Sequence, residues 1–376
     1  MRRLPCPFLY RWLAGFALFA LLTMIFPASR ASAQESKFTI KDDCTAFAFS
    51  PDGQRIVYAA RRYGKAKIRV RGKQQKVPIE HDDIWEVTLN GRTRRLVDGS
   101  KLVKSATPFS YAIQAIRIAP DGQHMTVEMA TRALAPKGEA SGRVKSGELT
   151  DLMDVQGKEI NIAGTKNSII EGGLDAAWLA DGQTVAYRKE PEGSLLYTLA
   201  YVRPASGASG PILPGHYFAA VAWNPAHNVA AAIERDRDLG GPIRLVWIDL
   251  VHQSKRTLAN LQGFSGHLTV SPSATQIAYY RGGNTIEIRS VDEPGKATQI
   301  KVPYGRYEWS ADGKYLLLKR GPETQSNLLI QISLPSGQYH DVFHGLLYHN
   351  FHISPDGQWV GVTEPGLQML KLYPAP

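Results

Sequence analysis

A segment near the start of the chain carries enough positive charge to bind an anion. Tyr63 lies within it. Guanidinium groups pair their N–H donors with carboxylate, phosphate or sulfate oxygens, and the candidate ligand contacts are Arg61, Arg62, Arg69 and Arg71. Basic residues at every second position, as at Lys65, Lys67, Arg69 and Arg71, are also typical of one exposed face of a solvated hairpin. Both interpretations therefore stay open. The eight basic residues, within 16 positions, are Arg61, Arg62, Lys65, Lys67, Arg69, Arg71, Lys73 and Lys76.

A second set of polar side chains begins segments that otherwise look like buried strands. Polar groups in such strands need hydrogen-bond partners. They would form either a network of pairs between neighbouring strands or a pocket around a ligand. The candidates for ligand contact are Arg117, Asp175, His267, Arg306 and Asn350, and the same set contains Glu308 and His352.

Histidines raise a metal-dependent possibility. Four gather near the C-terminus, at positions 340, 344, 349 and 352. Manganese or calcium ligation would use His267, His349 and His352. Residues three apart in an extended strand point to opposite sides, however, and shared ligation needs convergence. Separate neutral histidines, packed or exposed, are the alternative.

Several catalytic motifs are missing from the sequence. The nearest match to a Gly-x-Ser-x-Gly nucleophile elbow, at residues 263–267, lacks the final glycine, and no α/β region follows to complete a hydrolase. No glycine-rich phosphate loop occurs. The two cysteines do not form a metal-binding cluster. We therefore expect a non-catalytic protein without a cofactor.

The elements that position these residues form an internal repeat. Each copy has alternating apolar residues, a turn built on Pro-Asp-Gly or a variant of it, and a second apolar strand, which is the pattern of a β-hairpin. The copies are FAFSPDGQRIVY (47–58), IRIAPDGQHMTV (116–127), AAWLADGQTVAY (176–187), VAWNPAHNVAAA (221–232), LTVSPSATQIAY (268–279), YEWSADGKYLLL (307–318) and FHISPDGQWVGV (351–362).

A further hairpin follows most copies, giving four strands per unit. These predicted hairpins are Ile84–Val97, Leu152–Ile162, Ile243–Leu258 and Leu329–Val342. From position 179 onward the turns recur at steps of 45, 47, 39 and 44 residues, which matches a four-stranded propeller blade. The first two steps, 69 and 60, place insertions in blades 1 and 2. The blade 2 insertion, Thr131–Gly147, looks like a flexible extension beside the basic segment.

The two ends of the chain are predicted to share the last blade. The seventh unit stops after a third strand, Leu367–Leu372, and Lys37–Ile40 can supply the fourth. This closure removes an exposed sheet edge. The sequence thus predicts an all-β, seven-bladed β-propeller over residues 34–376, with the last blade closed by an N-terminal strand.

Residues 1–33 have the layout of a signal peptide. Arginines precede a charge-free run, Trp12–Phe26, and Ala31 and Ala33 are suited to cleavage near Gln34. The run is shorter than the roughly 20 residues that span a bilayer, and an uncleaved anchor is the alternative. Without its four arginines the chain keeps 40 Lys and Arg against 34 Asp and Glu, a net charge of +6. Only Cys44 remains, which excludes an internal disulfide.

The Ser-Pro-Asp-Gly turn and the following strand, as in Ile84–Gly91, resemble the TolB-like and WD-repeat-like propellers. Such repeats also occur in the non-catalytic domain of prolyl oligopeptidase relatives. The TolB propeller itself has six blades and a preceding α/β domain, so this chain departs from it. The segment YHNFHISPDG (348–357) resembles the histidine-bearing strand of oligogalacturonate lyases, which are manganese propellers. Propellers have many functions, and this resemblance therefore implies architecture more than activity.

We therefore expect a periplasmic or secreted propeller of bacterial type that binds a protein or an anionic glycan or lipid of the envelope. Export argues against nucleic acid as a partner. Membrane contact is expected only through an uncleaved leader. The alternatives are a metal-dependent polysaccharide lyase and an accessory propeller of a peptidase system.

Overall fold

The computed structural model describes most of the chain after residue 35. The chain divides into two units, residues 1–34 and 35–376, and the predicted signal peptide lies outside the described residues. None of the described helices is long and apolar enough to cross a membrane. The described ranges are 36–70, 73–102, 109–133, 146–165, 167–191, 194–236, 241–264, 266–320, 328–344, 350–364 and 369–376.

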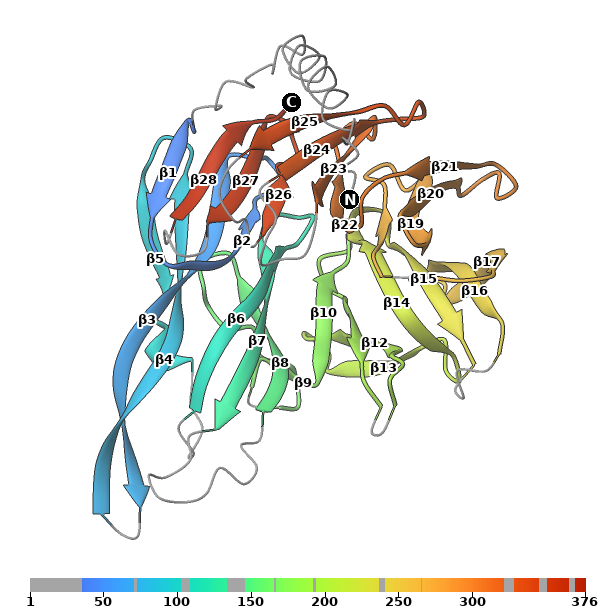
Figure 1. Ribbon diagram of the computed structural model, residues 1–376. Helices are drawn as coiled ribbons and strands as arrows, with labels where there is room; N and C mark the ends of the chain where they lie inside the picture. Colours follow the sequence, from blue (N-terminus) through green and yellow to red (C-terminus); the bar gives the residue numbers. More distant parts are fainter. Residues whose placement is uncertain are drawn as a thin grey trace, which may run out of the picture. The chain divides into compact units, whose positions relative to one another are not determined.

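The described strands form seven antiparallel sheets of four strands, which are the blades of a seven-bladed β-propeller (Figure 1). Blade 1 contains β2 (Cys44–Phe49), β3 (Arg55–Val70), β4 (Lys73–Thr88) and β5 (Thr93–Val97). Blade 2 contains β6 (Phe109–Ile118), β7 (His124–Ala133), β8 (Ser146–Asp154) and β9 (Ile169–Glu171). Blade 3 contains β10 (Gly173–Trp178), β11 (Val185–Lys189), β12 (Thr198–Arg203) and β13 (Ala208–Ile212).

The remaining blades repeat this order, and two short 3-10 helices, η1 (Gly99–Lys101) and η2 (Pro225–His227), lie in connections. Blade 4 contains β14 (Tyr217–Asn224), β15 (Val229–Arg235), β16 (Ile243–Asp249) and β17 (Ser254–Leu261). Blade 5 contains β18 (Leu268–Val270), β19 (Gln276–Gly282), β20 (Thr285–Ser290) and β21 (Ala297–Lys301). Blade 6 contains β22 (Gly305–Trp309), β23 (Tyr315–Arg320), β24 (Leu328–Ser333) and β25 (Tyr339–His344). Blade 7 contains β26 (Phe351–Ile353), β27 (Trp359–Glu364), β28 (Met369–Pro374) and β1 (Phe38–Lys41).

The predicted ring closure is confirmed. The N-terminal strand β1 pairs antiparallel with β28, with Ile40 opposite Leu370, and Figure 1 shows the two side by side. The third strand of blade 7 covers Met369–Pro374 rather than the predicted 367–372. Both ends of the described chain therefore hold one blade together.

One predicted strand position is wrong. Residues after β8 form a short hairpin, with an isolated bridge between Met153 and Glu159 and the Ile160 N–H donated to the Leu152 carbonyl at 2.8 Å. The fourth strand of blade 2 is instead β9, where Glu171 pairs with Leu149. The apolar pattern at 160 and 162 arises because both isoleucines pack against the cluster between blades 2 and 3. Ile170 lies buried in the same cluster. The sequence pattern alone does not choose between these two apolar stretches.

The apolar core is divided among the contacts between neighbouring blades. Alternate residues of one strand face opposite neighbours: Ile56 and Tyr58 pack with blade 7, whereas Val57 and Ala59 pack with blade 2. Clusters of this kind occur between each pair of neighbouring blades in the described residues. The period-2 pattern of strands thus fills both faces of every blade.

The turns between first and second strands meet their neighbours on one side of the ring. A Cβ atom on Gly53 would lie 2.6 Å from Cγ of Asp356 in blade 7, and one on Gly182 would lie 2.7 Å from Oδ2 of Asp121 in blade 2. We call this side the turn face. The opposite side, which carries the connections between second and third strands, is called the loop face. The long β3–β4 hairpin extends on the loop face.

Candidate functional site

A central channel forms a cavity among the described residues. Its volume is about 1020 Å³, and residues of all seven innermost strands line it. These strands are β2, β6, β10, β14, β18, β22 and β26. Cavities of several hundred cubic ångströms are typical of small-ligand sites, so the channel is the candidate functional site.

The repeat places side chains in two rings along the channel. In each blade the upper ring lies three residues before the last apolar residue of the inner strand (Phe49 in blade 1), and the lower ring lies one residue before it. All of these residues except Ala48 line the cavity. The upper ring is Ala46, Ala115, Asp175, Ala220, His267, Arg306 and Asn350. The lower ring is Ala48, Arg117, Ala177, Ala222, Thr269, Glu308 and His352.

One charged group spans blades 2 and 3. The guanidinium of Arg117 pairs with Glu128 at 3.0 Å and also with Asp175. Arg188 forms a further ion pair with Asp175 and lies over the Tyr197 ring, 4.2 Å from its centroid. The backbone N–H of Asp175 donates to Oε2 of Glu128 at 2.9 Å. Two arginines and two carboxylates thus neutralise one another.

A second group spans blades 6 and 7. Glu308 accepts from Arg306 at 3.2 Å and pairs with Nδ1 of His352 at 2.9 Å. Oδ1 of Asn350 accepts from Arg306 at 3.2 Å. Burial acts to raise the pKa of Glu308, but the contacts with His352, Arg306 and the Ile353 N–H outweigh it and lower that pKa to about 2. The carboxylate is therefore held ionised.

His267 joins blade 5 to blade 6. Its Nε2 lies 2.9 Å from the carbonyl oxygen of Tyr307. A carbonyl only accepts, so Nε2 carries the proton and Nδ1 keeps its lone pair. Burial and the nearby Arg306 lower the pKa of His267, which favours the neutral ring.

The structure places five of the predicted ligand-contact residues around this channel: Arg117, Asp175, His267, Arg306 and Asn350. Their contacts also match the predicted network between neighbouring strands. Three further residues of the site were not predicted from the sequence. Glu128 and Arg188 come from the second strands β7 and β11, and Tyr197 comes from the loop after β11. The available signal was a charged residue within an otherwise apolar second strand, as at Glu128 and Arg188.

The basic segment has a different environment from the channel. Arg61 contacts the buried Asp82 at 2.9 Å, and Arg62 binds Asp42 through two N–H groups at 2.7 and 2.9 Å. Both guanidinium groups are thus neutralised at the base of the β3–β4 hairpin. Arg69 belongs to β3, but its side chain lies outside the described residues, as does the whole of Arg71.

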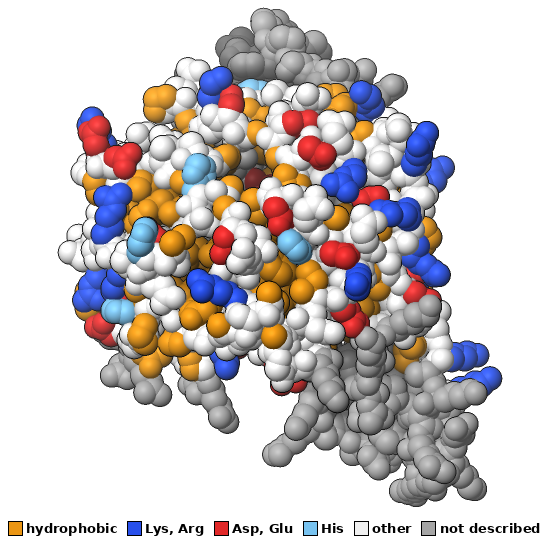
Figure 2. Space-filling view, turned by 180° about the vertical axis from the view of Figure 1, so that it is seen from behind, with side chains coloured by type: hydrophobic (Ala, Val, Ile, Leu, Met, Phe, Trp, Pro, Cys, Tyr) orange, Lys and Arg blue, Asp and Glu red, His pale blue; other side chains and the backbone are white. Residues whose placement is uncertain are grey.

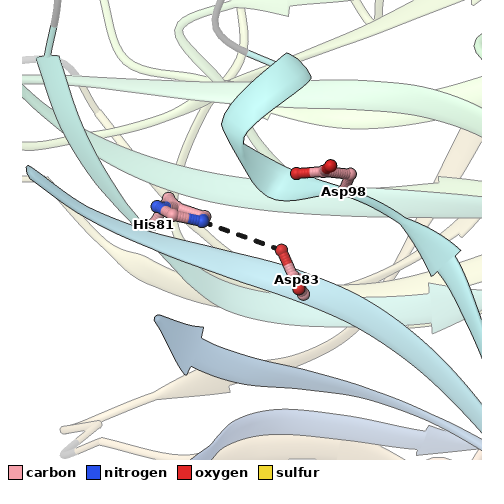
Figure 3. A group of neighbouring side chains, drawn as sticks. All are labelled: His81, Asp83 and Asp98. Carbon is pink, nitrogen blue, oxygen red and sulfur yellow. Dashed lines mark ion pairs between the residues drawn. The ribbon is translucent and has the colours of Figure 1, made fainter. Parts of the chain in front are cut away.

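A group with metal-ligating side chains lies in blade 1. In the described part of the chain, His81, Asp83 and Asp98 form the only such group of three whose ligand atoms lie within 4.8 Å of one another (Figure 3). The guanidinium of Arg95 lies 3.5 Å from Asp83 and 3.8 Å from Asp98. Oδ1 of Asp83 also accepts the Gly99 N–H at 2.8 Å. Arg95 therefore already supplies the cation between these carboxylates.

In the described part of the chain, neither His267 nor His352 belongs to such a group. His267 and His352 are engaged with Tyr307 and Glu308, respectively, and His349 lies outside the described residues. A metal at the channel stays a prediction.

Comparisons with known proteins support the fold. No family model matches the sequence, and no curated protein gives a significant match. The Cps50 (Swd1) β-propeller domain of Myceliophteria thermophila is similar in structure, with a TM-score of 0.57 and 11% identity over 90% of this chain and 100% of that domain. A chain of the mitotic checkpoint complex also has a TM-score of 0.57, with 13% identity over 91% of this chain and 96% of that one.

Proposed function

We propose that this chain is an exported, non-catalytic propeller that binds a protein partner on its loop face. The observation that carries the proposal is a set of exposed apolar side chains on that face. Tyr63, Leu195 and Tyr304 are 72%, 80% and 52% exposed; Tyr63 belongs to the extended strand β3, and the other two lie in separate connections between strands. Exposed aromatic and apolar side chains supply much of the energy of protein interfaces. One similar propeller was solved within an assembly, the mitotic checkpoint complex, which supports a binding role.

The mixed charge of the surface supports a protein partner over a strongly anionic polymer. Figure 2 shows Lys and Arg side chains interspersed with Asp and Glu on the face in view, with apolar side chains between them. Such a surface suits a partner of mixed composition. Among the described basic side chains of the hairpin, Arg61 and Arg62 are neutralised, whereas Lys65 and Lys76 are exposed to an anionic partner.

A photo-crosslinking amino acid placed on each face tests the proposal. We expect a discrete protein adduct in the producing cells when the crosslinker replaces Leu195. Val251 is the matched control, because it is 62% exposed and lies in the turn between β16 and β17 on the turn face. Equal adducts at both positions, or none at Leu195, would contradict binding on the loop face.

A further inference from the structure

The channel has balanced charge despite its many ionisable groups. Its lining holds three arginines and three carboxylates: Arg117, Arg188, Arg306, Glu128, Asp175 and Glu308. Each arginine contacts at least one of the carboxylates. An ionic ligand would have to replace one of these partners and leave the other charge uncompensated, which is costly in a partly buried site. The channel therefore favours a ligand without net charge.

The polar side chains that blades 2 and 3 and blades 5 to 7 contribute to the channel, which we call the polar arcs, can still form hydrogen bonds after these pairs are made. Nδ1 of His267 retains a lone pair, because Nε2 donates to Tyr307. The amide of Asn350 uses its oxygen for Arg306, which leaves its two N–H donors. The Nε–H of Arg188 has no partner in the described part of the chain, but it is shielded from solvent and so is not offered to a ligand in the channel. The cavity thus offers both donors and acceptors at fixed positions.

The walls between the polar arcs are apolar. Blade 4 contributes Ala220, Ala222 and Trp223, and blade 1 contributes Ala46 and Phe47. The alanines leave room beside the strand, because a methyl group stands where other blades place arginine, glutamate or histidine. A flat ligand with C–H groups on its faces and polar groups at its edge would match both kinds of wall.

We propose that the central channel binds a neutral, polyhydroxylated ligand, a short saccharide of about two to three units. Hydroxyl groups both donate and accept hydrogen bonds, and this suits a wall that presents both functions without net charge. The C–H faces of the sugar rings pack against the alanine wall of blade 4. The sugar proposal rests on the channel lining and does not depend on protein binding at the loop face.

Calorimetric titration of the purified chain with matched sugars tests the site. The neutral probes are cellotriose, maltotriose and N,N′,N″-triacetylchitotriose, and the charged probes are sialyllactose and the chitosan trimer. We expect at least one neutral trisaccharide to bind at least tenfold more tightly than either charged probe. Absence of binding by all three neutral sugars at millimolar concentration, or equal or tighter binding of a charged probe, would overturn the proposal.

Gln114→Trp provides a variant that fills the channel without breaking an ion pair. Gln114 is exposed and lines the cavity. We expect the bulky side chain to weaken the neutral sugar at least tenfold, with an unchanged melting temperature. Gln183→Trp, at an exposed position of a turn on the turn face, is the matched control and should bind normally. Unchanged affinity in Gln114→Trp would place the sugar elsewhere and overturn the proposal, whereas the Leu195 crosslink would be unaffected.

Discussion

Asp82 is a fully buried carboxylate that links blade 1 to blade 2. It accepts the Ile113 N–H at 2.7 Å, the Thr45 hydroxyl at 3.0 Å and Nε of Arg61 at 2.9 Å. Asp82→Ala leaves an arginine and a backbone donor without their partner. We expect the free energy of unfolding to fall by about 3–5 kcal/mol, measured by urea denaturation.

The control for Asp82 is an exposed ion pair in blade 4. Asp236 is 55% exposed and lies 3.7 Å from Arg244, so Asp236→Ala should change the free energy of unfolding by less than about 1 kcal/mol. Similar losses in both variants would mean that Asp82 does not join the blades.

Glu308 makes stability depend on pH. Its pKa in the folded chain is about 2, below the ordinary 4.5. Its contribution is therefore complete above pH 4.5 and is lost as the pH falls towards 2. We expect Glu308→Gln to lower the free energy of unfolding at pH 7 by about 1–3 kcal/mol and to match the unmodified chain near pH 2. Glu293→Gln, at a side chain 59% exposed, serves as control, and a constant Glu308→Gln effect across pH would exclude this role.

At the residue scale, sequence predicted which positions face the channel but not the partners that they meet. The repeat aligned Asp175 with Arg306 and placed Arg117 in the column of Glu308. It gave no sign that Asp175 would share two arginines, because Arg188 comes from another strand. Likewise Arg62 looked free in sequence, whereas Asp42, 20 positions earlier, neutralises it. Distant partners of this kind depend on how neighbouring strands and blades pack.

At the element scale, the turn face depends on glycines that adopt positive φ. Gly53 and Gly313 have φ of +70° and +71°, but a Cβ on Gly53 would meet Asp356 at 2.6 Å, whereas one on Gly313 would meet nothing within 4 Å. We expect Gly313→Ala to cost about 1–2 kcal/mol of unfolding free energy from backbone strain alone. Gly53→Ala should cost at least about 1 kcal/mol more, since it also displaces a neighbouring turn.

Thermal and urea denaturation of the two glycine variants measure this difference. Equal costs would show that neighbouring turns do not support one another.

The turns and the strands beside them were predicted from the sequence, because the turn residues and the period-2 strands are local signals. The fourth strand of blade 2 was not predicted, because two apolar stretches bond to β8: Ile160 donates to Leu152, and Ile170 pairs with Thr150 as part of the strand.

At the scale of the whole molecule, export with cleavage of the signal peptide and closure of the propeller ring are two separate predictions. Export predicts that the recovered protein begins near Gln34, which N-terminal sequencing of the periplasmic or secreted fraction would establish. Replacing Ala31 and Ala33 with arginine should block cleavage and retain the chain at the membrane, because signal peptidase requires small residues there. A chain recovered in the cytoplasm with an intact N-terminus would contradict export.

Ring closure places a demand on the residues just after that cleavage point. Strand β1 covers Phe38–Lys41, and Ile40 is buried against Leu370. Removing residues 34–41 would expose the edge of β28, and unpaired edges recruit other chains. We expect the truncated chain to form oligomers by light scattering and to melt at a lower temperature. Lys41→Ala, at an exposed position of the same strand, should be as monodisperse as the unmodified chain. A truncated chain with unchanged size and melting temperature would show that six complete blades and an open seventh already suffice.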